Sequence, residues 1–329
     1  MEEGKARLSV SLSLLVAFSS ASAEMPRTLN RPCTPAQIAT NDFLAAYVAT
    51  PGQWLYQSNT FTIPHILSDD DAQFALELQS KLGKRGIELI ILPIPSKPVV
   101  AASEASFDPT SARSQYLSDV ASLRRRGLTV VDGLTPALDN YVDPATGLKF
   151  YARTDSHWTT YGANLTAKAV GKRIRASAQY PQLSKTTYNI TRTAITRVGN
   201  LAAQMNQLCG TRFGPESEFS YTFKKRDEAS ELLSSDSTPI ALAGTSYSSE
   251  KYMHFADFIE EATHLDVANY SESGGQKFTA LLRFLRSDSL KSDPPHFLIW
   301  EFPNSYETLS SDQLKQLRDA LQQSNQLAP

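Results

Sequence analysis

The feature that most constrains this fold is a regular alternation between short apolar runs and longer amphipathic stretches. Three apolar runs, at residues 87–92, 239–243 and 297–301, are continuous enough to be strands buried on both faces. Helical patterns flank them, and helices placed in this way cover the two faces of a parallel sheet. We therefore predict an α/β fold, a three-layer sandwich with a mostly parallel central sheet.

The remaining elements follow from the same patterns. Ser68, Asp69 and Asp70 place hydrogen-bond acceptors and negative charge at a helix start, and Gly86 ends that helix before the first apolar strand. The predicted helices are residues 35–46, 68–84, 110–126, 134–141, 160–176, 249–261, 278–285 and 310–323. The predicted strands are residues 87–92, 128–131, 149–152, 186–192, 239–243, 264–268 and 297–301.

The domain organisation is predicted to be simple. The chain has 329 residues, of which 41% are hydrophobic, so it can bury a full core. It contains no internal repeat and no low-complexity linker, and residues 24–329 are therefore expected to form one domain. Residues 180–235 are harder to interpret. They could be an insertion that carries substrate contacts or a plain surface excursion.

The first 23 residues have the order of a secretory signal peptide. Lys5 and Arg7 precede an apolar run over residues 8–18, and cleavage is expected after Ala23. Glu2 and Glu3 reduce the positive charge expected at the start of a signal peptide, so a disordered or anchoring N-terminus is the alternative. No later apolar stretch approaches the roughly 20 residues of a transmembrane helix. We expect a soluble mature protein that is exported to the periplasm.

Charge and cysteine content narrow the classes of partner. The chain has 32 Lys+Arg against 34 Asp+Glu, so its net charge does not create a positive electrostatic field that would attract nucleic acid or an anionic membrane. The two cysteines are Cys33 and Cys209. In an oxidising compartment such a pair is more often a bridge, with two separate buried thiols as the alternative. A metal pair is disfavoured because no Cys or His cluster surrounds either residue.

Half of a candidate catalytic site lies in Asp155-Ser156-His157, just before the helix expected at residue 160. The carboxylate can orient one imidazole nitrogen while the other nitrogen takes a proton from a serine. A metal site is the alternative, because aspartate and histidine also bind metals. No second cluster with ligand spacing supports it.

The candidate nucleophile is Ser246, which follows the predicted strand at residues 239–243. Gly244 lets the backbone bend sharply, so the serine would be presented at the C-terminal edge of the sheet, beside backbone N–H groups that can hold an oxyanion. By itself the motif Gly-Thr-Ser is weak evidence, because serines are common in turns and at helix starts.

Together these motifs resemble the alginate O-acetyltransferase family of the AlgX and AlgJ type, whose catalytic domain is SGNH-hydrolase-like. The resemblance rests on Thr-Asp-Ser-His-Trp-Thr-Thr-Tyr-Gly-Ala at residues 154–163 and Gly-Thr-Ser-Tyr-Ser at residues 244–248. It implies that Ser246 takes up an acetyl group, that His157 is the general base and that Asp155 holds the imidazole. The Asp-His pair precedes the serine, so the motif order is permuted relative to ordinary SGNH hydrolases.

The resemblance also implies a function and partners. The protein is expected to be an exported O-acetyltransferase that transfers acetyl groups to hydroxyls of an exopolysaccharide such as alginate. Its acetyl source would be a membrane-bound O-acyltransferase, and it would need no cofactor or metal. The resemblance further implies a domain-spanning disulfide between Cys33 and Cys209. The alternatives are an acetyl-esterase with the same three residues and a non-catalytic polysaccharide-binding or secretion-complex protein.

Two features depart from the family pattern. Because the chain ends at Pro329, we expect it to lack the carbohydrate-binding module that follows the catalytic domain in the AlgX type. The N-terminal segment is expected to be cleaved, in contrast to the membrane anchor of the AlgJ type. Both features leave the identity of the polysaccharide open.

Four further residues are candidates for contacts with substrate. Asn200 could donate to an oxyanion or a sugar, with an ordinary turn asparagine as the alternative. Trp158 and Tyr247 could stack on a sugar ring or pack in the core. Lys97 could face an anionic uronate, although a solvated loop lysine is favoured.

Overall fold

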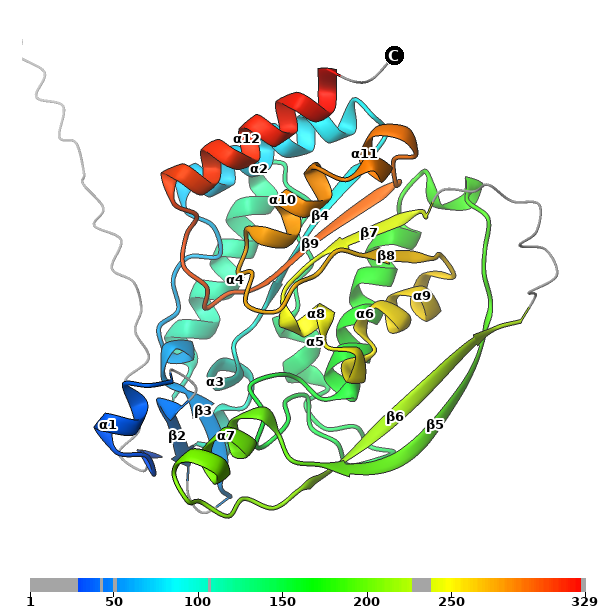
Figure 1. Cartoon of the computed structure of the whole chain (residues 1–329). Coiled ribbons are helices and arrows are strands. Elements are labelled where there is room, and N and C mark those ends of the chain that lie inside the picture. Colours follow the sequence, from blue (N-terminus) through cyan, green and yellow to red (C-terminus); the bar gives the residue numbers. More distant parts are fainter. Residues whose placement is uncertain (1–28, 42–43, 50–51, 106–107, 227–237, 327–329) are drawn as a thin grey trace, which may run out of the picture.

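A four-stranded parallel sheet lies at the centre of the protein. The computed structural model describes residues 29–41, 44–49, 52–105, 108–226 and 238–326, so the predicted signal peptide lies outside the described residues. The strand order is β4-β9-β7-β8, and every pairing in this sheet is parallel (Figure 1). The four strands are β4 (Glu88–Ile94), β9 (Phe297–Pro303), β7 (Ile240–Ala243) and β8 (Val267–Asn269).

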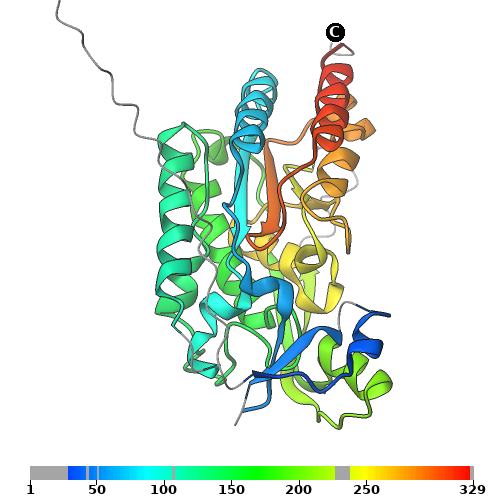
Figure 2. The same cartoon turned by 90° about the vertical axis from the view of Figure 1, so that its left-hand side faces the viewer.

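Helices cover both faces of this sheet. Figures 1 and 2 show α10 and α12 on one face and α4 and α6 on the other. The α2 helix packs against β4 and α12, and α9 packs against α6. These helices are α2 (Asp69–Gly83), α4 (Thr110–Arg125), α5 (Leu134–Asp139), α6 (Thr160–Arg175), α9 (Phe255–Thr263), α10 (Thr279–Leu285) and α12 (Ser311–Gln326). The α/β prediction is confirmed.

Local chemistry explains how the helices beside the sheet begin. Ser68 and Asp71 form a capping box at the start of α2, as the acceptors in the sequence suggested. At α6 the cap is Thr159, whose hydroxyl accepts from the N–H of Gly162. Gly162 also lets α6 approach the preceding segment, because a Cβ there would lie 2.3 Å from the carbonyl oxygen of Phe150.

Several sequence-based boundaries were wrong. The helix expected over residues 35–46 is only α1 (Pro35–Ile38). The strands predicted at residues 128–131 and 149–152 form only isolated bridges. The helix expected over residues 249–261 is split into α8 (Ser246–Ser249) and α9, because His254 between them adopts a left-handed conformation with φ 57°.

A small antiparallel sheet lies next to the main domain near the N-terminus. It joins β1 (Leu29–Asn30), β2 (Ala46–Ala49) and β3 (Trp54–Gln57) in that order. β2 pairs with β3, and all four of its residues are buried. It shares only Ala46 with the helix expected over residues 35–46. Two further short α-helices are α3 (Lys97–Val100) and α11 (Asp288–Ser292).

The segment over residues 180–235 contains a long two-stranded ribbon and a helix. The antiparallel strands are β5 (Tyr188–Arg197) and β6 (Glu216–Lys225), and α7 (Asn200–Leu208) lies between them in the chain (Figure 1). Residues 227–237 lie outside the described residues. The N-terminal ends of β6 and α7, and the C-terminal end of β5, lie close to residues 153–156.

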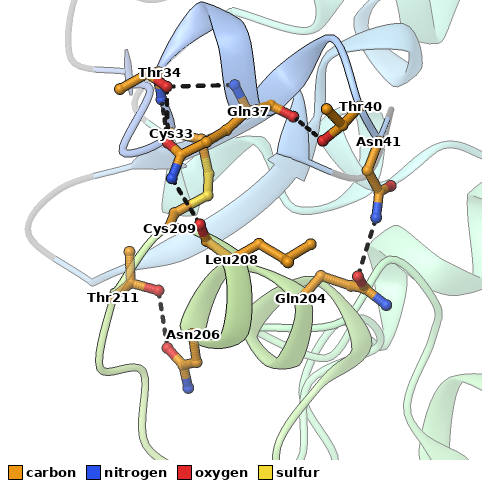
Figure 3. Close-up of a disulfide and its surroundings, with 10 residues drawn as sticks. All are labelled: Cys33, Thr34, Gln37, Thr40, Asn41, Gln204, Asn206, Leu208, Cys209 and Thr211. Carbon is orange, nitrogen blue, oxygen red and sulfur yellow. Dashed lines mark hydrogen bonds between the residues drawn. A yellow bond between two sulfur atoms is a disulfide. The ribbon is translucent and has the colours of Figure 1, made fainter.

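The predicted disulfide joins Cys33 to Cys209 across 176 residues of sequence (Figure 3). It ties the N-terminal segment to the C-terminal end of α7. Gln37 donates to the carbonyl of Leu208 at 2.6 Å beside it, and Asn41 donates to Gln204 at 3.0 Å. None of the described helices is long and apolar enough to cross a membrane.

Candidate active site

Ser246 begins α8, directly after the turn that ends β7. Its turn is organised by Glu301, a fully buried carboxylate on the neighbouring strand β9. Thr245 donates to Glu301 from its backbone N–H at 2.8 Å and from its hydroxyl at 3.0 Å, and Ser248 donates at 2.6 Å. Gly244 is required here, because a Cβ would lie 2.4 Å from a carboxylate oxygen of Glu301.

The acid-base pair reaches this turn from the start of α6. His157 Nε2 lies 2.8 Å from Ser246 Oγ, and His157 Nδ1 lies 2.7 Å from Asp155 Oδ1. The backbone N–H of His157 donates to the same carboxylate oxygen at 3.0 Å. The three residues are therefore within hydrogen-bond reach in the order serine, imidazole and carboxylate. This is the geometry that a nucleophile, its base and an orienting group require.

The second oxygen of Asp155 has partners of its own. Arg197 Nη2 and the backbone N–H of Asn200 donate to Asp155 Oδ2 at 2.8 and 2.9 Å. Burial alone would raise the pKa of Asp155, but the hydrogen bond and charge of His157 and the charge of Arg197 outweigh it. They hold the pKa of Asp155 well below its usual range, so the carboxylate is ionised at neutral pH.

Tyr306 is a further polar group near the serine. Burial and the charge of Glu301 raise the pKa of Tyr306 to about 12, although the nearby side chain of Ser246 lowers it in part. The phenol therefore stays protonated at neutral pH and keeps a proton to donate.

Two aromatic candidates for sugar stacking lie inside the protein. Trp158 is fully buried and packs against Phe150, Tyr247 and Phe255. Tyr247 is 8% exposed, its ring lies 4.8 Å from that of His157, and its hydroxyl donates to the carbonyl of Ser156 at 2.9 Å. Both rings therefore pack in the core beside the catalytic candidates, in agreement with the core-packing alternative.

The two polar candidates, Asn200 and Lys97, form hydrogen bonds within the protein. The amide of Asn200 accepts from the N–H of Ser156 and donates to its hydroxyl, both at 2.8 Å. Lys97 is 2% exposed and donates to the carbonyls of Arg153 and Asp155 at 3.0 and 2.8 Å. The expectation of a solvated loop lysine was therefore wrong. The sequence could not show this, because the burial of Lys97 depends on aromatic residues of β3 far away in the chain.

Sequence reasoning missed three residues of the site: Arg197, Glu301 and Tyr306. Glu301 left a signal that could have been used, since it is a carboxylate within the otherwise apolar strand β9. Arg197 and Tyr306 left none, because each meets the site only through the fold. In the described parts of the chain, no group of three or more His, Cys, Asp and Glu side chains could hold a metal ion.

Comparison with known proteins assigns the domain. A family model described as the SGNH hydrolase-like domain of the acetyltransferase AlgX matches residues 48–304. The chain belongs to this AlgX family. This confirms the resemblance inferred from the two sequence motifs.

Individual members of the family agree with this assignment. The alginate biosynthesis protein AlgX of Pseudomonas fluorescens is 31% identical over 241 residues, which cover 70% of this chain and 49% of that protein. The probable alginate O-acetylase AlgJ of Azotobacter vinelandii is 25% identical over 295 residues, 84% of this chain and 75% of AlgJ. This chain thus spans about half the length of the AlgX relatives.

A solved structure of Pseudomonas aeruginosa AlgX has the same fold. It superposes with a TM-score of 0.67 at 24% identity, covering 86% of this chain and 68% of the AlgX chain. An α/β domain with a central parallel sheet is therefore shared with that family member.

Proposed function

We propose that this protein is an exported O-acetyltransferase that moves acetyl groups onto hydroxyls of an exopolysaccharide such as alginate. Two observations support the substrate and the reaction: membership of the AlgX family, and relatives named as alginate biosynthesis proteins or a probable alginate O-acetylase. The observation that carries the mechanism is the hydrogen-bonded series Ser246, His157 and Asp155.

In the first half-reaction the hydroxyl of Ser246 attacks the carbonyl carbon of an acetyl donor. His157 Nε2 accepts the hydroxyl proton as the Oγ–C bond forms. The ionised Asp155 stabilises the imidazolium that results and keeps the ring in position. When the tetrahedral intermediate collapses, the bond to the donor oxygen breaks. His157 then returns its proton to the departing group, leaving an acetyl ester on Ser246.

The oxyanion of the tetrahedral intermediate needs donors beside Ser246 Oγ. The backbone N–H of Ser246 at the start of α8 has no acceptor within the part of the chain that the structure describes. The protonated hydroxyl of Tyr306 is the other candidate, because Tyr306 lies near enough to Ser246 for that side chain to lower its pKa. These two groups are the donors of the proposed mechanism. Asn200 is not assigned this role, because its amide is bonded to Ser156.

In the second half-reaction a hydroxyl of the polysaccharide attacks the acetyl ester. His157 removes the proton of that hydroxyl as the new ester bond forms. When this intermediate collapses, the bond between the acetyl carbon and Ser246 Oγ breaks and His157 returns the proton to Ser246. The acetyl donor is supplied by a membrane-bound O-acyltransferase, and the reaction takes place in the periplasm. The Cys33–Cys209 disulfide is consistent with an exported location.

Mass spectrometry after exposure to an activated acetyl ester tests the mechanism. Wild-type protein should carry one acetyl group on Ser246, and a mannuronate oligosaccharide added afterwards should remove it and become acetylated. Ser246→Ala should lower both reactions by at least about a thousand-fold with its fold preserved. Ser249→Ala, on the same short helix, is the matched control and should behave like wild type.

Two outcomes would contradict the proposal in different ways. Release of acetate without any acetylated sugar would favour the acetyl-esterase, which uses the same residues with water as the acceptor. An unchanged level of polymer acetylation in cells that carry Ser246→Ala would instead favour a non-catalytic polysaccharide-binding protein.

A further inference from the structure

The acid-base loop, residues 153–157, has no helix or long strand of its own, yet its backbone groups are well satisfied. Many of the hydrogen bonds to this backbone come from charged side chains of distant elements. Glu216 of β6 accepts from the N–H groups of Arg153 at 2.7 Å and Thr154 at 2.9 Å. Lys97 of α3 donates to the carbonyls of Arg153 at 3.0 Å and Asp155 at 2.8 Å. Hydrogen bonds to charged groups are the stronger class.

The setting of Lys97 is unusual for a lysine. The side chain is 2% exposed, and no carboxylate of the described residues lies within ion-pair distance of its ammonium. The ammonium instead lies 5.2 Å from the ring centre of Trp54 and 5.3 Å from that of Tyr56. Burying an ammonium costs free energy unless hydrogen bonds or aromatic faces stabilise the charge. Both hydrogen bonds of the Lys97 ammonium are to carbonyls of the acid-base loop.

We propose that Lys97 and Glu216 are positioning residues that hold the acid-base loop as an oppositely charged pair. Lys97 holds carbonyl oxygens of the loop and Glu216 holds its N–H groups. Together they fix Asp155, and through it His157, relative to Ser246. The inference rests on the proposed roles of Ser246 and His157, and it assigns to Lys97 a role different from contact with a uronate.

The charge of Lys97 is also placed to respond to pH. Burial lowers the pKa of Lys97 to about 7, although Glu216 and Asp155 oppose this shift, and Arg153 adds to it. Another charged pair lies near the aromatic rings that contact Lys97: Lys149 packs on Trp54 of β3 and forms an ion pair with Glu104. Because the folded pKa is depressed, Lys97 loses its charge as pH rises through about 7. Its bonds to the loop carbonyls then weaken.

The test measures turnover of p-nitrophenyl acetate by the full chain, which requires neither the polymer nor the natural donor. Lys97→Met and Glu216→Gln should each lower kcat by about 10- to 100-fold with little change in KM. The double variant should lose less than the product of the two single losses. The decline of wild-type kcat above pH 7 should be absent in Lys97→Met.

Lys185→Met is the matched control, because Lys185 also donates to two backbone carbonyls and packs on a ring, that of Tyr180, away from the loop. It should keep the wild-type kcat and pH profile. Lys97→Arg keeps the charge, so it should retain more activity than Lys97→Met above pH 7. Circular dichroism and thermal melting check that each variant is folded.

Wild-type kcat and an unchanged pH profile in Lys97→Met would overturn the inference. If Lys97→Met does not fold, Lys97→Arg and Glu216→Gln decide, and wild-type kcat and pH profile in both would overturn it. If turnover is too slow, the rate at which a sulfonyl fluoride labels Ser246 gives the same comparison. A protein that hydrolyses the ester in a Lys97-dependent way but never acetylates a sugar would contradict the proposed function alone.

Discussion

Arg197 donates to Asp155 Oδ2 at 2.8 Å, while His157 occupies the other carboxylate oxygen. The buried carboxylate is thus shared between a permanent cation from β5 and the imidazole that it orients. Together with the hydrogen bond and charge of His157, the charge of Arg197 keeps Asp155 ionised despite its burial.

Replacing Arg197 by Met should lower kcat/KM for acetyl-ester turnover by about 10- to 100-fold, because a charge-assisted hydrogen bond to Asp155 is lost. Arg197→Lys should restore part of the activity. Arg192→Met is the control, since Arg192 lies on the same strand but packs on Phe219 at 4.8 Å instead. Equal rates for Arg197→Met and wild type would show that Asp155 needs no second partner.

Removing the hydroxyl of Tyr306 tests the oxyanion donor. Tyr306→Phe should lower kcat by about 100- to 1,000-fold, the usual cost of one such donor, and leave KM nearly unchanged. Steady-state kinetics with p-nitrophenyl acetate measure both constants. A change confined to KM would instead assign Tyr306 to substrate binding.

Gly199 lies at the tight contact between α7 and the acid-base loop. A Cβ there would lie 2.3 Å from the carbonyl carbon of Thr154, so Gly199→Ala must displace the loop or the helix. We expect a loss of about 1–3 kcal/mol in the free energy of unfolding, together with a fall in kcat. Gly214→Ala, which adds a Cβ with nothing within 4 Å, should change neither quantity in urea unfolding and ester assays.

Glu260 on α9 should make stability depend on pH. Burial, together with the charges of Asp266 and Asp257, raises the pKa of Glu260 to about 7, although the N–H of Val267 lowers it in part. Because the folded pKa exceeds the unfolded one, wild-type stability from this group is full below about pH 4.5 and falls as pH rises to about 7.

Glu260→Gln should therefore melt several degrees higher than wild type at pH 8, and this advantage should disappear at pH 4. Thermal melting of both proteins across this range provides the measurement, with the pH 4 values as the internal control. An advantage that does not vary with pH would show that Glu260 is not the group responsible.

Part of the candidate site could be predicted from local sequence alone. Asp155 and His157 are two residues apart, so their contact is encoded within a single turn. Ser246 follows an apolar strand and a glycine, and in a parallel α/β fold that local order favours a serine at the C-terminal edge of the sheet. By contrast, the helix expected over residues 35–46 is only α1 (Pro35–Ile38), because boundaries depend on contacts that local propensity does not include.

The sequence by itself predicted the α/β class and the central strands β4, β7 and β9, because continuous apolar runs indicate strands buried on both faces. It favoured a bridge between Cys33 and Cys209 but left two separate thiols as the alternative. Only the tertiary structure decided that His157 meets Ser246 across 89 residues, and that Glu301, Arg197 and Lys97 surround them. The physical reason is that a buried charge is stable only beside its partners. Those partners come from β9, β5 and α3, which are brought together by folding and not by their order in the chain.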